Sequence, residues 1–107
     1  MDINPLSPGH ILVIPKTHAE KMHELPDANL TEILPLCKKI VNALHEQGLN
    51  YNILQNNGKL AHQAVDHVHF HIIPRRNTKE GLGIEWNTQT VSHEKLAEIA
   101  TKVKANM

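Results

Sequence analysis

The segment from residue 65 to residue 74 constrains the fold more than any other part of the chain. It reads Val-Asp-His-Val-His-Phe-His-Ile-Ile-Pro, in which histidines and apolar residues alternate. Because successive side chains of a β-strand point to opposite faces of the sheet, the alternation predicts a strand over 65–73 that ends before Pro74. The buried face would carry Val68, Phe70 and Ile72, and the opposite face would carry His67, His69 and His71. A slip of one residue would bury all three histidines, so the pattern also fixes the register.

The three histidines of this segment form a candidate site. Neighbours on one face of a strand lie about 6 to 7 Å apart, so three imidazoles could meet a single phosphate group. A neutral imidazole is a nucleophile and an imidazolium is an acid near neutral pH, which suits attack on phosphorus and protonation of the departing atom. Three histidines could also hold a zinc ion with one open position, and the spacing leaves both possibilities open.

Two further strands are predicted. The run from His10 to Ile14 is apolar and β-branched between turn residues, which predicts a short strand in the middle of the sheet. Residues 51–55 form a similar run that ends at Asn56-Asn57-Gly58, a typical turn sequence.

Two helices complete the prediction. Apolar residues recur at three- and four-residue steps in a segment that begins near Pro26-Asp27 and closes at Gly48, which predicts an amphipathic helix over 27–47. Pro35 lies inside it and should remove one hydrogen bond and bend the axis. Ser92 can cap a final helix, whose expected buried stripe comprises Leu96, Ile99, Ala100 and Val103. Strands and helices in mixed order favour an antiparallel α+β fold.

Composition limits the classes of protein that the chain can be. With 107 residues, it has room for one domain, expected to span 1–107. Lys plus Arg and Asp plus Glu each number 11, so no strong field exists to hold nucleic acid or an anionic membrane. The single cysteine, Cys37, excludes an internal disulfide and fits a reducing compartment. Without an apolar run of membrane length or a signal-like start, a cytoplasmic location is expected.

Three motifs carry a resemblance to a known family. His67-Val68-His69-Phe70-His71 followed by two apolar residues resembles the signature of the histidine-triad (HIT) nucleotide hydrolases and transferases. Residues 8–18, Pro-Gly-His-Ile-Leu-Val-Ile-Pro-Lys-Thr-His, resemble the family's strand before its long helix, and Asn56-Asn57-Gly58 resembles its phosphate loop. Three motifs in the right order make the resemblance specific. It implies a small antiparallel sheet with one long helix and a C-terminal helix, a homodimer formed through the long helix and a neighbouring strand, and no cofactor or metal.

The resemblance also implies roles for single residues. His69 would attack the α-phosphorus of a dinucleoside polyphosphate or nucleoside phosphoramidate and form a nucleotidyl-histidine intermediate. His71 would bind phosphate or protonate the leaving group, and His67 would orient the neighbouring imidazole. The remaining implied contacts are Asn56 and Gln63 to phosphate through their amides, the backbone N–H groups of Gln63, Ala64 and Val65 to phosphate, Asp2 to ribose, and Ile3 to the sugar and base. His10 and His18 are expected to make structural hydrogen bonds.

The chain departs from the family pattern in three places. The family's first two strands, which supply much of the purine pocket, have no counterpart in this sequence, so an open sheet edge is expected to pair with another subunit. His62 stands where the family usually has glycine, and Ala64 stands where a hydroxyl often binds phosphate, at a cost on the order of 1 kcal/mol. These departures keep two alternatives open, a nucleotide-binding protein with little turnover and a histidine-based zinc-binding protein.

Overall fold

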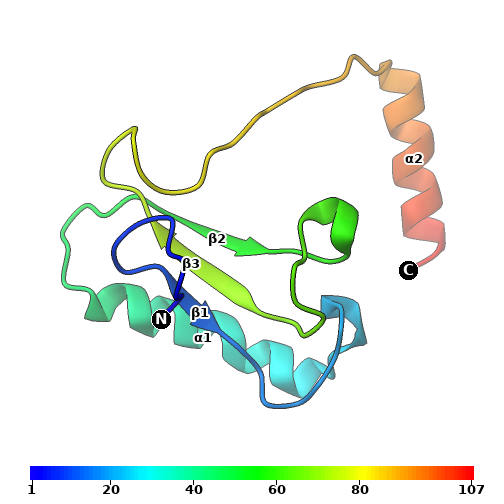
Figure 1. The fold of residues 1–107 in the computed structure, drawn as a ribbon. Helices are drawn as coiled ribbons and strands as arrows, with labels where there is room; N and C mark the ends of the chain where they lie inside the picture. The colour runs from blue at the N-terminus through cyan, green and yellow to red at the C-terminus, as the bar shows by residue number, and fades with distance from the viewer.

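The computed structural model describes residues 1–107 and contains three strands, two α-helices and two short 3-10 helices (Figure 1). In chain order, these elements are β1 (Ile11–Val13), η1 (Met22–Glu24), α1 (Asp27–Ala43), β2 (Tyr51–Gln55), η2 (Lys59–Ala61), β3 (Phe70–Pro74) and α2 (His93–Ala105). The α+β class predicted from the sequence is confirmed.

The three strands form one antiparallel sheet in the order β1-β3-β2. The histidine-bearing strand β3 is therefore central, and the prediction that the strand at residues 10–14 lies in the middle of the sheet is wrong. Both neighbours pair with β3 in a common register, so that His71 lies between Leu12 of β1 and Leu54 of β2. Of the three strands, β3 is the one that pairs on both of its edges.

Strand β3 is shorter than the predicted span of 65–73. Its pairing begins at Phe70, which lies opposite Val13 on β1 and Gln55 on β2, the last residues of both neighbours. Before this point, the Val68 N–H donates instead to the carbonyl of Ala19 at 2.8 Å. The strand also continues through Pro74, which was expected to follow it.

Helix α1 runs below the sheet and covers one of its faces (Figure 1). The predicted alternation holds on this face, where Val68 and Ile72 are fully buried and Phe70 is nearly so. The helix contributes Ile33 and Cys37 to the same core. Other core members are Val13, Ala19 and Leu25, with Ile11, Leu30, Ile40 and Val41 packed against them.

Helix α1 ends four residues before the predicted position 47. Its last residue is Ala43, and His45 then takes a left-handed conformation with φ of 53°. Glycine is the residue that most readily adopts this conformation after a helix, and the prediction placed the end at Gly48 for that reason. Pro35 lies inside the helix as expected.

Helix α2 does not pack on the rest of the chain, and the prediction of a buried stripe on it is wrong. The side chains of Leu96, Ile99 and Val103 are each about half exposed, and no residue of the helix is buried. An extended segment carries α2 away from the sheet (Figure 1). The predicted cap is confirmed, since the Ser92 side chain accepts a hydrogen bond from the Lys95 N–H. No helix in the structure has the length and apolarity that crossing a membrane would need.

Candidate active site

The position of the protons on His69 follows from one hydrogen bond. Nδ1 of His69 lies 2.7 Å from the main-chain carbonyl oxygen of His67. A carbonyl can only accept, so Nδ1 carries the hydrogen and the neutral ring has an unprotonated Nε2. An imidazole nitrogen with a free lone pair is a nucleophile, and its orientation is fixed by the main chain of the segment just before β3.

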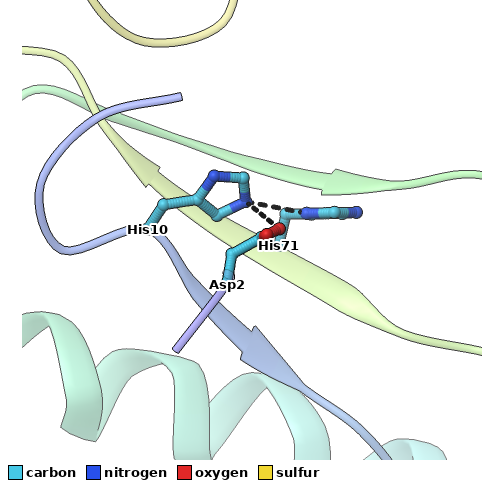
Figure 2. A group of neighbouring side chains, drawn as sticks. All are labelled: Asp2, His10 and His71. Atoms are coloured by element: carbon cyan, nitrogen blue, oxygen red, sulfur yellow. Dashed lines mark hydrogen bonds and ion pairs between the residues drawn. The ribbon is translucent and has the colours of Figure 1, made fainter. Parts of the chain in front are cut away.

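A second chain of contacts fixes the protons on His71. The Leu6 N–H donates to Nδ1 of His10 at 3.1 Å, so the proton of a neutral His10 must lie on Nε2. That nitrogen is 2.9 Å from Nδ1 of His71 (Figure 2). His71 therefore accepts at Nδ1 and carries its own proton at Nε2. The ring centroids of His71 and His69 are 5.0 Å apart, which places a donor beside the nucleophile.

Burial favours the neutral forms of both linked histidines. It lowers the pKa of His10, against the opposing effect of the Asp2 carboxylate. Burial also lowers the pKa of His71, and the neighbouring His69 and His10 lower it further. The proton positions derived from the hydrogen bonds are consistent with both shifts.

Asp2, His10 and His71 form a compact cluster (Figure 2). One potential ligand atom from each lies within 4.8 Å of the others. The cluster differs from the zinc site considered in the sequence, which used His67, His69 and His71. In the neutral form derived above, both His10 nitrogens already have protein partners, so a metal ion at the cluster would have to displace one of these hydrogen bonds.

Both ring nitrogens of His67 contact groups other than His69 and His71. Its Nε2 donates to the carbonyl of Pro15 at 2.8 Å, and its Nδ1 lies 3.1 Å from Nδ1 of His18. The expectation that all three imidazoles meet one phosphate is therefore wrong. The carbonyl of His67, and not its imidazole, makes the contact that orients His69. The structural hydrogen bonding expected of His18 is confirmed by this pair.

The loop between β2 and β3 is held by the side chain of Gln63, which is buried. Its oxygen accepts from the Gly58 N–H at 2.7 Å, and its nitrogen donates to the Glu20 carbonyl at 2.6 Å. Both ends of the amide are thus used to shape the loop. The main-chain N–H of Gln63, expected to bind phosphate, donates instead to the Gly58 carbonyl at 3.0 Å, whereas the N–H groups of Ala64 and Val65 have no main-chain acceptor and can bind anionic oxygens.

A cavity of about 220 Å³ lies on the sheet face opposite α1, and Gln63 and Val65 are not among its lining residues. Asp2, Asn56 and Ala64 line it as the sequence suggested, together with His69 and His71. Ile3 is not among the lining residues and its side chain is 91 % exposed. The further lining residues are Asn4, Leu6, His10, Leu54, His62, Ile73 and Leu82.

Comparisons with known proteins agree with this geometry. A model of the HIT domain matches residues 1–78. An adenosine 5'-monophosphoramidase of Schizosaccharomyces pombe is 54 % identical over 97 % of the chain and 80 % of its own length. The chain belongs to the HIT domain family.

Solved structures of other HIT proteins superpose closely on this one. A histidine triad nucleotide-binding protein from Candida albicans is 43 % identical, with a TM-score of 0.91 over 99 % of this chain and 78 % of that one. A HIT family member from Bacillus subtilis is 35 % identical, with a TM-score of 0.90 over 100 % of this chain and 79 % of that one. The family resemblance drawn from the three motifs is confirmed.

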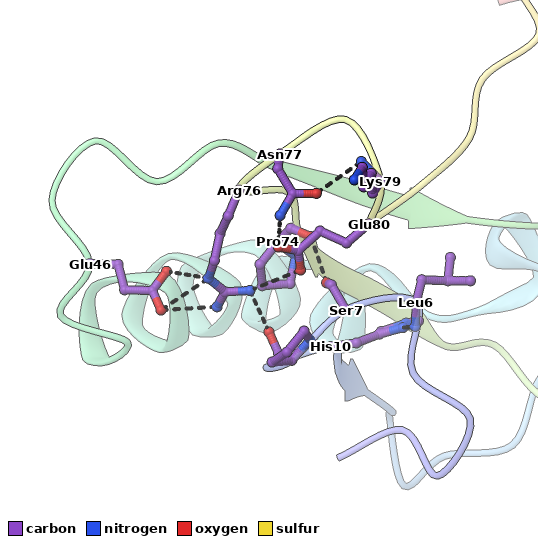
Figure 3. Close-up of polar contacts among 10 residues, drawn as sticks. Leu6, Ser7, His10, Glu46, Pro74, Arg76, Asn77, Lys79 and Glu80 are labelled. Atoms are coloured by element: carbon purple, nitrogen blue, oxygen red, sulfur yellow. Dashed lines mark hydrogen bonds and ion pairs between the residues drawn. The ribbon is translucent and has the colours of Figure 1, made fainter.

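The loop before β1 of this HIT domain is braced from several sides (Figure 3). The Ser7 hydroxyl donates to the Pro74 carbonyl at 2.6 Å, and Arg76 donates to the Pro8 carbonyl at 2.8 Å. Two nitrogens of the Arg76 guanidinium donate to the Glu46 carboxylate, and these hydrogen bonds raise the pKa of the guanidinium. This bracing fixes the loop whose Leu6 N–H sets the proton on His10.

Sequence reasoning missed the part that His10 plays in the site of this HIT domain. It predicted structural hydrogen bonds for His10, which the contact to Leu6 confirms. The contact to His71 joins residues 61 positions apart and depends on the pairing of β1 with β3. The only signal in the sequence was a histidine at the first position of the predicted strand at residues 10–14.

The stability of this HIT domain should fall in mild acid. The folded pKa values of His10 and His71 lie below the ordinary 6.5 that they regain on unfolding. As pH falls through 6.5, the unfolded chain binds protons first, so the free energy of unfolding decreases. Urea titrations between about pH 7.5 and about pH 5.5 would measure this decrease. His71→Gln should reduce the slope and the exposed-site variant His23→Gln should not; equal slopes in all three proteins would contradict the linkage.

Proposed function

We propose that this chain is a nucleotide hydrolase that cleaves adenosine phosphoramidates through a covalent intermediate on His69. The observation that carries the proposal is the 2.7 Å hydrogen bond from Nδ1 of His69 to its own main chain, which leaves Nε2 unprotonated. The relative from S. pombe, named as an adenosine 5'-monophosphoramidase, supports the substrate class.

The proposed reaction has two steps. Nε2 of His69 attacks the α-phosphorus, the P–N bond breaks, and its electron pair stays on the departing nitrogen. Water then attacks the phosphorus, which releases AMP and restores His69. Over both steps one water is consumed, with its hydroxyl on AMP and its proton on the amine. His71 presents Nε2–H to the departing nitrogen and is the group through which this proton moves.

The remaining groups of the cavity would position the substrate. The Ala64 N–H and the Asn56 amide would hold the phosphate oxygens as charge builds on them, together with the N–H of Val65, which follows Ala64 in the chain but does not line the cavity. Asp2 would accept from ribose, and the exposed Ile3 would lie against the sugar and base. A dinucleoside polyphosphate could enter the same site, since its leaving group also departs from an α-phosphorus.

Intact-protein mass spectrometry tests the intermediate. The full chain is mixed briefly with an adenosine phosphoramidate, quenched in denaturant, and compared with His69→Asn. We expect the mass of one adenylyl group on the wild-type protein only, together with release of AMP. Binding of AMP without an adduct or turnover would favour the alternative of a nucleotide-binding protein. Stoichiometric zinc after purification without chelators would favour a zinc-binding protein.

We also propose that residues 1–107 form one domain that assembles as a homodimer. In this dimer, the apolar face of α2 packs against a second copy of the chain. An isolated helix of 13 residues is marginal in water, yet α2 exposes a continuous apolar face. The radius of gyration is 16.7 Å, against about 13 Å for a compact chain of this length. A reducing compartment suits the free thiol of Cys37, so a cytoplasmic location is part of the proposal.

Sedimentation equilibrium tests the dimer. The wild-type protein should sediment at twice the mass of the chain, because burial of the α2 stripe offsets the cost of association. The double variant Leu96→Glu with Ile99→Glu should be monomeric, while Thr101→Glu on the polar side of the same helix should remain dimeric. A monomeric wild-type protein at micromolar concentration would contradict the proposal.

A further inference from the structure

His62 is held in an unusual backbone conformation at the edge of the cavity. Its φ of 69° and ψ of 28° lie in the left-handed region, which glycine adopts freely and other residues rarely adopt. Its N–H donates to the carbonyl of Lys59, and its own carbonyl accepts from the Asn56 side chain. The next residue, Gln63, is anchored by two further hydrogen bonds. The direction in which the His62 side chain leaves the loop is therefore fixed.

The imidazole of His62 lines the same cavity as His69 and His71. The two cavity histidines 62 and 71 are also electrostatically coupled: burial lowers the pKa of His71 most, and His69, His10 and His62 lower it further. Non-glycine residues in strained conformations cluster at functional sites, where the surrounding contacts hold them in place. The cavity is thus lined by four histidines, His10, His69, His71 and His62. His62 comes from the end of η2.

His62 is the one imidazole of the cavity whose ring has no hydrogen-bond partner in the protein. No lysine or arginine lines the cavity. Burial favours neutral forms of His10 and His71, and these two rings are bonded to each other. His69 supplies the attacking nitrogen. The imidazole of His62 is exposed and makes no hydrogen bond within the protein, so its N–H is available to donate to an anionic oxygen.

His62 lines the same cavity as His71, the ring that is proposed to face the departing nitrogen. It comes two residues before Ala64, whose N–H is proposed to hold a phosphate oxygen, while Asp2, proposed for ribose, comes from the N-terminal loop. With ribose at Asp2 and phosphate at Ala64, as proposed, the unpartnered His62 ring is available to a group attached beyond the phosphate.

We propose that His62 is a specificity residue whose imidazole binds an anionic group carried by the leaving portion of the substrate. The inference rests on the proposed function and deepens it. The favoured substrates are nucleotides whose α-phosphate bears a leaving group with a negative charge close to the bridging atom. A carboxylate next to the departing nitrogen and a second phosphate both meet this description. His62 then raises affinity for such substrates and contributes little to those with a neutral leaving group.

Nucleotide binding measured by calorimetry on the full chain tests this without turnover. AMP lacks the second anionic group and ADP carries it. His62→Gly and His62→Asn remove the imidazole and keep residue types that accept the left-handed conformation. We expect each variant to weaken ADP binding about five- to tenfold and to change AMP binding by less than about twofold. His45→Gly is the matched control, because it also replaces a histidine of positive φ, at the end of α1 and outside the cavity.

A kinetic arm uses two adenosine phosphoramidates, one of a neutral amine and one of an amine with a neighbouring carboxylate. His62→Gly should lower kcat/KM about five- to tenfold for the carboxylate substrate only. Equal losses for AMP and ADP, or for both amines, would assign His62 to the α-phosphate and overturn the inference. Unchanged ADP binding would overturn it too. If the wild-type protein binds neither nucleotide, the proposed function itself fails, which separates the two failures.

Discussion

Replacing His69 with alanine should reduce the release of AMP from an adenosine phosphoramidate by at least about 10³-fold. Alanine removes Nε2 of His69, which the hydrogen bond at Nδ1 leaves unprotonated. This nitrogen belongs to the ring beside His71, the proposed proton donor. The pair of His10 and His71 does not depend on His69 and should stay in place. Steady-state kinetics under saturating substrate would measure the loss, and the affinity for AMP should change far less than the rate.

The matched control is His23→Ala, which removes an exposed histidine from η1. Its activity should equal that of the wild-type protein, since His23 does not line the cavity. Near-normal turnover in His69→Ala would show that another group attacks phosphorus. The covalent mechanism would then be wrong, whatever the protein binds.

Replacing Ile72 with alanine should lower the free energy of unfolding by about 2 to 5 kcal/mol. Ile72 is fully buried at the centre of β3, opposite Ile11 on one neighbour and Ile53 on the other. Only 13 of the 107 residues are buried, so the core has few other contacts with which to close the cavity that the substitution leaves. Total stabilities of small domains are about 5 to 15 kcal/mol, so this loss is a substantial fraction of the free energy of unfolding.

Urea denaturation followed by circular dichroism would measure this loss. Leu60→Ala is the control, because Leu60 is fully exposed in η2 and its truncation should change the free energy of unfolding by less than about 0.5 kcal/mol. A loss below about 1 kcal/mol for Ile72→Ala would contradict the packing described for the centre of the sheet.

The two outcomes together separate the roles of neighbouring residues on β3 and the segment before it. His69→Ala should impair chemistry with little effect on folding, and Ile72→Ala should impair folding first. Alternate residues of one segment thus serve the site and the core, because the sheet has α1 on one face and the cavity on the other.

Much of the site was predictable because strand periodicity is a local property. The alternation at 67–72 predicted which side chains enter the core and which face the site, and the burial of Val68, Phe70 and Ile72 confirms it. The hydrogen bond that leaves Nε2 of His69 free also lies within the motif, between residues 67 and 69. The cap at Ser92 was found in the same way, since it involves residues three positions apart.

The remaining features depend on contacts between distant segments. The pairing of β3 with both neighbouring strands ends at Phe70, and His67 lies before that point. Its imidazole contacts Pro15 and His18. His10 joins His71 only through the pairing of β1 with β3.

The apolar stripe of α2 also depends partly on neighbouring residues and partly on the packing of distant segments. The sequence by itself determined that Leu96, Ile99 and Val103 share one face of a helix, because the helical repeat is set by neighbouring residues. Only the tertiary structure decided that this face does not pack against the chain's own sheet. Periodicity specifies the direction of a side chain, whereas its partner is set by the packing of the whole molecule.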